Sequence, residues 1–61
     1  MTDSQRMFWV KNDQHLTGWH KQSRTTLRQF VTDNRAEIDH AIQCVLETGR
    51  RTSDCLLEVL S

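Results

Sequence analysis

The sequence predicts an all-α fold with two antiparallel amphipathic helices, over about residues 14–32 and 35–48, and a short C-terminal helix over about 53–60. Apolar residues recur at intervals of three and four in both long segments, which is the spacing of one helical face. Polar residues that favour helix ends separate the segments, and proline is absent. No repeat or flexible linker divides the chain, so residues 13–61 are expected to form a single domain.

The first long helix is indicated by an apolar stripe that also takes in two small or polar side chains. Its members are Leu16, Trp19, His20, Ser23, Leu27, Phe30 and Val31. Asn12 or Asp13 is expected to cap the start of this helix. Gly18 weakens the first turn by up to about 1 kcal/mol relative to alanine, so Thr17 is an alternative start.

The second long helix carries stronger end signals. Asn34 followed three residues later by Glu37 has the spacing of a capping box, and Gly49 is the type of residue that ends helices in the left-handed conformation. Between these ends one face repeats the apolar residues Ile38, Ala41, Ile42, Val45 and Leu46.

The segments at the two ends of the chain are shorter and more apolar than the two long helices. Thr52 or Ser53 is expected to cap the C-terminal helix, with Asp54 in its first turn and then Leu56, Leu57, Val59 and Leu60. Residues 1–12 are expected to form an N-terminal arm or a short strand. Because the apolar run within residues 5–11 is too short to classify by periodicity, an extra helical turn is a further alternative.

A chain of 61 residues is expected to need more than its own core, because small domains bury only about 60% of the surface that their unfolded chains expose. We expect homodimerisation into a helical bundle to supply the difference. Cys44 and Cys55 are not expected to form a disulfide, since nothing resembling a secretory signal precedes them. A cytoplasmic location follows, and the longest apolar run, four residues, is too short to span a membrane.

Charge is divided unevenly along a chain whose net charge is zero. Residues 1–28 carry a net charge of +3 and residues 29–61 a net charge of −3. The two halves are expected to attract each other within the fold or across a dimer. The alternative is that the basic half contacts phosphate or an acidic partner.

Catalysis and metal binding are not indicated. His40 and Cys44 lie one helical turn apart, but tetrahedral zinc needs three or four converging ligands. Asp39 diverges by about 100° from its neighbour His40 on a helix, so it is not placed to orient that imidazole. We therefore expect no catalytic residues, no metal and no cofactor.

Surplus apolar surface at both ends of the chain favours protein binding. The sequence predicts a small non-enzymatic regulatory or adaptor protein, of the kind found among bacterial and phage regulators, that binds another protein through an apolar helical surface. Arg24 and Arg28 are expected to set the partner's orientation. The expected apolar contacts are Phe8, Trp9, Trp19, Leu57 and Leu60.

The alternative is a dimeric DNA- or RNA-binding regulator. Its expected phosphate contacts are Lys21, Arg24, Arg28, Arg50 and Arg51. Residues 35–60 resemble the first two helices of a helix-turn-helix domain, without the third helix that would enter the major groove. A ribbon-helix-helix dimer with residues 6–11 as an intersubunit strand is another version of this alternative.

Overall fold

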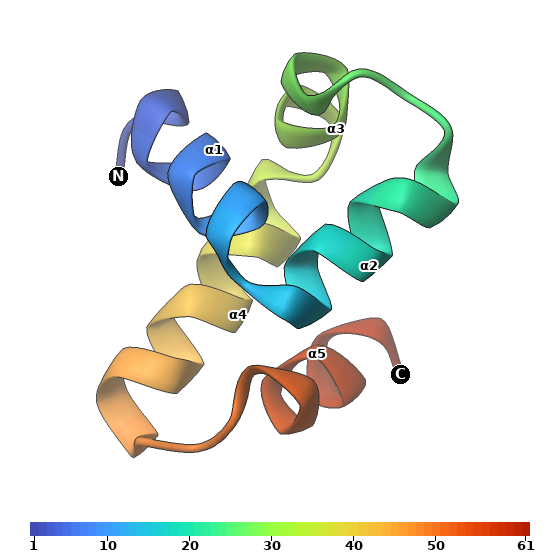
Figure 1. Ribbon diagram of the computed structural model, residues 1–61. Coiled ribbons are helices and arrows are strands. Elements are labelled where there is room, and N and C mark those ends of the chain that lie inside the picture. Colours follow the sequence, from blue (N-terminus) through green and yellow to red (C-terminus); the bar gives the residue numbers. More distant parts are fainter.

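The computed structural model describes all 61 residues. They fold into five helices joined by short turns, with no strand, which confirms the all-α class. The helices are α1 (Asp3–Asn12), α2 (Gln14–Ser23), α3 (Leu27–Asp33), α4 (Arg35–Thr48) and α5 (Thr52–Leu60). In Figure 1, α1 and α3 lie over the N-terminal half of α4, α2 lies beside α1, and α5 folds back beneath α2. No helix is both long enough and apolar enough to cross a bilayer.

The N-terminal residues form a helix in place of the expected arm or short strand, and of the alternatives the extra helical turn comes nearest to it. Thr2 caps it: the Thr2 hydroxyl accepts from the Gln5 amide at 3.2 Å, and Gln5 Oε1 accepts from the Thr2 amide at 2.8 Å. Val10 on α1 is fully buried, so the helix belongs to the core. The strand that the ribbon-helix-helix alternative needs at residues 6–11 is therefore absent.

The single helix expected over residues 14–32 is wrong, because it is broken into α2 and α3. Asp13 caps the start of α2, as expected, by accepting from two backbone amides. Arg24 then ends α2 in the left-handed conformation with a φ of 60°, and the Thr26 hydroxyl caps α3 by accepting from the Gln29 amide at 3.1 Å. Hydroxyl side chains at residues 23–26 offer the backbone such alternative hydrogen bonds, which explains the break within a continuous apolar pattern.

The ends of α4 differ in how well they were predicted. Gly49 ends the helix in the left-handed conformation with a φ of 71°, as expected. The capping box expected at its start is not formed, because the Asn34 side-chain amide donates to the Phe30 carbonyl at 2.9 Å instead. At α5 the N-cap is Arg51, without a side-chain cap, and Asp54 lies in the first turn.

The core draws one or more residues from every helix. Its members are Val10, Leu16, Phe30, Val31, Ile38, Ala41, Ile42 and Leu56. No buried side-chain nitrogen or oxygen lacks a hydrogen-bond partner. A single subunit therefore encloses a contiguous apolar core without unsatisfied polar groups.

Ion pairs join the first helix, in the basic half of the chain, to α4 in the acidic half. The Arg6 guanidinium donates to both carboxylate oxygens of Asp39, with Nε to Oδ1 at 2.7 Å and Nη2 to Oδ2 at 2.8 Å. Arg6 also pairs with Asp3 at 2.6 Å, and Asp3 in turn accepts from Arg35. This network fastens α1 to α4, so part of the attraction between the basic and acidic halves lies within the subunit.

Candidate functional site

An apolar groove runs between α2 and α5. Its lining residues are Gln14, His15, Gly18, Trp19 and Gln22 from α2 and Ser53, Leu56, Leu57 and Leu60 from α5. None of these is an aspartate, glutamate, lysine or arginine. The groove therefore offers apolar contact and neutral hydrogen-bonding groups, a composition suited to burying a partner's apolar side chains.

The α2 wall is built around a half-buried tryptophan. The Trp19 ring meets the buried Phe30 ring edge to face, with ring centroids 4.8 Å apart, which fixes the indole at the base of the wall. Gly18 lies beside it, and a Cβ atom added there would meet no other atom within 4 Å. The space over Gly18 is therefore open to an occupant of the groove.

The α5 wall presents two leucines to solvent. Cys55 and Leu56 turn inward and are buried, whereas Leu57 is 71% exposed and Leu60 is 55% exposed. Leu57 and Leu60 are three residues apart, so they lie on the same face of the helix. Their exposure agrees with the expectation that the C-terminal leucines are not all covered within one subunit.

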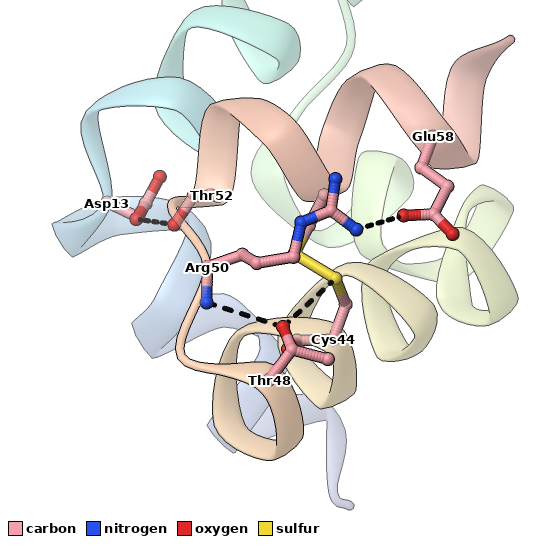
Figure 2. The surroundings of a disulfide bond; sticks show 7 residues. Asp13, Cys44, Thr48, Arg50, Thr52 and Glu58 are labelled. Carbon is pink, nitrogen blue, oxygen red and sulfur yellow. Dashed lines mark hydrogen bonds and ion pairs between the residues drawn. A yellow bond between two sulfur atoms is a disulfide. The ribbon is translucent and has the colours of Figure 1, made fainter.

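Two polar contacts hold α5 in place beside α2 and α4 (Figure 2). The Thr52 hydroxyl donates to Asp13 Oδ2 at 2.7 Å, joining the start of α5 to the junction between α1 and α2. Arg50 Nη1 donates to Glu58 Oε2 at 2.7 Å at the surface. The orientation of α5, and with it the width of the groove, depends in part on these contacts.

Cys44 and Cys55 form a disulfide between α4 and α5, so the expectation of two free thiols is wrong. The left-handed turn at Gly49 reverses the chain, which brings the two Cα atoms to 5.9 Å, within the range that a disulfide spans. Cysteine number and the N-terminal sequence carry no information about this proximity. The cross-link is one of the devices by which small domains supplement their cores, and it removes the argument from which a reducing compartment was inferred.

The remaining apolar residues expected at the partner interface do not join the groove. Phe8 is 66% exposed and lines a separate shallow pocket between α1 and α3, together with Met7 and Leu27. Trp9 is half-buried and packs against the core. The structure thus brings Trp19, Leu57 and Leu60 together and leaves Phe8 and Trp9 elsewhere.

The basic residues are divided between the two helix junctions. Lys21, Arg24 and Arg28 lie around the turn between α2 and α3, where all three are exposed. The single helix expected over residues 14–32 would have carried all three, but α2 ends before Arg24. The other two, Arg50 and Arg51, lie in the connection from α4 to α5, and Figure 1 shows these junctions at opposite ends of the molecule.

The residues weighed for metal binding or catalysis take other roles. Cys44 is in the disulfide, and the Asp39 carboxylate is bound by Arg6. His40 is exposed on α4. No three histidine, cysteine, aspartate or glutamate side chains are grouped as metal ligands would be.

The α2 wall was partly missed by sequence reasoning. His15, Gly18 and Gln22 share a face with Trp19 at intervals of three and four residues, but this periodicity is carried by polar side chains and a glycine. The spacing of apolar residues along the chain therefore does not mark these three positions as part of the groove.

Comparison with known proteins adds no further assignment. No protein-family model matches the chain, and no curated protein or solved structure matches it significantly. Function is therefore argued from the groove and its surroundings.

Proposed function

We propose that this chain is a small non-enzymatic regulatory or adaptor protein that binds an apolar helix of another protein in the groove between α2 and α5. The observation that carries the proposal is the exposure of Leu57 and Leu60 beside the half-buried Trp19. Full burial of an exposed leucine is worth about 1.5–3 kcal/mol, so covering this pair gives binding a substantial driving force.

The shape of the groove supports a helical occupant. Both of its walls are single helices, and amphipathic helices dock into such grooves through side chains spaced three and four residues apart. Trp19 is held from behind by Phe30, so it loses little freedom when it is covered. Tryptophans in this situation tend to dominate interface energies.

Self-association through the same groove is part of this proposal. Exposed Lys21 lies one turn from Gly18 on the α2 side, and exposed Asp54 lies one turn before Leu57 on the α5 side. In a two-fold pairing that sets α2 of each copy against α5 of the other, the opposite charges of Lys21 and Asp54 would attract across the interface. Such a homodimer would cover the groove until a partner displaces the second copy.

Affinity capture with matched variants tests the proposal. The wild type, Leu57→Asp and Phe8→Asp are each immobilised and exposed to a host lysate. Leu57 and Phe8 make a matched pair because both are exposed apolar side chains, but only Leu57 lines the groove. A protein retained by wild type and Phe8→Asp but lost by Leu57→Asp is the expected result. Retention that survives Leu57→Asp contradicts binding in the groove.

Dilution tests self-association separately. The wild type should sediment as a dimer that dissociates on dilution, and Leu57→Asp should sediment as a monomer at every concentration. A wild type that stays a compact monomer of 7.2 kDa across the series would exclude the homodimer while leaving partner binding open to the capture experiment.

A nucleic-acid-binding regulator is the second candidate, favoured by one observation. Lys21, Arg24 and Arg28 are exposed around one turn and form no ion pair with an acidic side chain. Retardation of duplex DNA at about 50 mM salt that disappears by about 200 mM would support phosphate contact. Loss of that retardation in Arg24→Gln but not in Arg51→Gln would assign it to this turn.

A cytoplasmic location belongs to the same proposal. Disulfides in that compartment are mostly transient, so the location requires the Cys44–Cys55 cross-link to open and close. To test the location and the opening of the cross-link together, host cells are fractionated after their thiols have been blocked. The fraction that holds the protein and the state of its two cysteines are then measured. A protein found outside the cytoplasm, or one whose disulfide is never open, contradicts this location.

A further inference from the structure

The two cysteines of the disulfide differ in their exposure to solvent. Cys55 is completely buried, whereas Cys44 is half-buried. Both line an open pocket between α4 and α5. Figure 2 shows Arg50 and Thr48 beside the cross-link. An incoming thiolate in this pocket therefore meets the more exposed Cys44 before the fully buried Cys55.

We propose that the Cys44–Cys55 disulfide is a thiol-exchange site at which a thiolate from a small thiol or a protein cysteine attacks Cys44 Sγ, and that opening it releases α5. The attacking thiolate is the class of ligand that this pocket takes. The release of α5 concerns regulation of the groove and so rests on the proposed function, whereas the exchange step does not.

The exchange proceeds in two balanced steps. In the first, the thiolate forms a bond to Cys44 Sγ, the bond between the two cysteine sulfurs breaks, and Cys55 leaves as a thiolate that takes a proton from water. In the second, another thiolate attacks the sulfur of the bound thiol, and Cys44 leaves as a thiolate. Overall, two external thiols are oxidised to one disulfide while the protein disulfide is reduced to two thiols.

The groups around Cys44 suit this role. The Thr48 hydroxyl donates to the Cys44 carbonyl, and its oxygen lies 3.9 Å from Cys44 Sγ, so the side chain borders the sulfur without blocking it. His40 and Arg50 line the same pocket, and Arg50 is paired with Glu58. Glu47 also lines it and accepts from Gln43. Glu47 is thus the one charged group of the lining without an ion-pair partner, and it leaves the pocket with a net charge of −1.

Opening the cross-link leaves α5 held mainly by apolar packing. Cys55 and Leu56 are its fully buried side chains, and Val59 is partly buried against the core. The remaining polar contacts are the hydrogen bond from Thr52 to Asp13 and the exposed ion pair between Arg50 and Glu58. Exposed pairs of this kind contribute little, so reduction is expected to let α5 undock and to remove one wall of the groove.

Mapping of the first exchange product on the wild-type chain tests the site of attack. The oxidised protein is mixed with a limiting amount of reduced glutathione, quenched with acid, alkylated under denaturing conditions and digested. We expect glutathione on Cys44 and the alkyl group on Cys55, in at least about tenfold excess over the reverse product. Equal amounts, an excess on Cys55, or the absence of any disulfide to open would overturn the proposal.

Single-cysteine variants give a second measurement. With oxidised glutathione, Cys55→Ser should form the mixed disulfide at Cys44 at least about tenfold faster than Cys44→Ser forms it at Cys55. Comparable rates in two folded variants would overturn the assignment. If either variant fails to fold, the mapping on the wild type decides, because it uses the unaltered chain.

Hydrogen exchange tests the consequence for α5 without any partner. After reduction by excess glutathione, amides of α5 should lose protection while those of α1 keep it, since α1 is fastened to α4 by Arg6. Unchanged protection of α5 would overturn the release of α5. Neither readout involves groove binding, so failure here is distinguishable from failure of the proposed function.

Discussion

The Asp13 carboxylate connects the junction between α1 and α2 to the start of α5 through Thr52. Asp13 Oδ1 accepts from the amides of His15 at 2.9 Å and Leu16 at 3.0 Å, capping α2, while Oδ2 accepts from the Thr52 hydroxyl at 2.7 Å. One side chain therefore both starts one wall of the groove and positions the other.

Substitutions at these two positions should separate the roles. Thr52→Val removes only the contact to α5 and should lower the free energy of unfolding by about 1 kcal/mol. Asp13→Ala removes the helix cap as well and should lower it by about 2 kcal/mol. Urea denaturation measures both, and equal losses in the two variants would contradict the double role.

The two glycines should respond oppositely to alanine. At Gly18 the added methyl group meets nothing and the backbone is helical, so Gly18→Ala should stabilise the chain by up to about 1 kcal/mol. At Gly49 the φ of 71° disfavours a side chain, so Gly49→Ala should destabilise by about 1 kcal/mol. Thermal unfolding checks the sign of each change, and a loss in Gly18→Ala would show that the space there is filled.

The disulfide should make a large contribution to stability. Cross-linking positions that are 11 residues apart reduces the entropy of the unfolded chain, which corresponds to about 3 kcal/mol. Cys44→Ala should lose about this amount, and adding a reductant to the wild type should produce a similar loss while leaving the variant unchanged. If reductant leaves the denaturation curve of the wild type unchanged, the cross-link does not make this contribution.

Acid should weaken the attachment of α1 to α4. Arg6 lowers the pKa of Asp39 below its ordinary value of 3.8, mainly by hydrogen bonding. Arg35 does the same to the pKa of Asp3, assisted by Arg6. Because the folded carboxylates bind protons less readily than the unfolded ones, this stabilisation is present above about pH 4 and is lost as the pH falls below it.

Asp39→Asn provides the control for that prediction. The asparagine variant should be less stable than wild type near neutral pH and should approach it as the pH falls towards 3, since protonation removes the same charge from the wild type. Denaturant titrations at a series of pH values measure the difference. A gap that stays constant with pH would mean that the charge of Asp39 is not what stabilises the contact.

Local signals predicted the helical class, α4 with its glycine end, and α5, because caps and apolar spacing act over a few residues. The break at Arg24 was not predicted, because the apolar stripe continues across it into α3. The helix α1 was signalled by the capping-box pair Thr2 and Gln5, which lies ahead of the apolar run.

The site was predicted less completely than the fold. Leu57, Leu60 and Trp19 were identified as surplus apolar residues, but their meeting in one groove depends on how α5 packs against α2. That packing follows from the turn at Gly49, the disulfide and the contact from Thr52 to Asp13, all of which join residues distant in sequence. Spacing along the chain does not encode such contacts.

Site-specific photocrosslinking tests most directly whether the groove between α2 and α5 is the docking surface. A photoreactive amino acid is placed at Leu57 in the groove or at Leu46, which is 67% exposed on α4 and lines none of the pockets. The captured protein should crosslink from position 57 and not from position 46. Crosslinking from 46 but not from 57 would contradict the assignment of the groove.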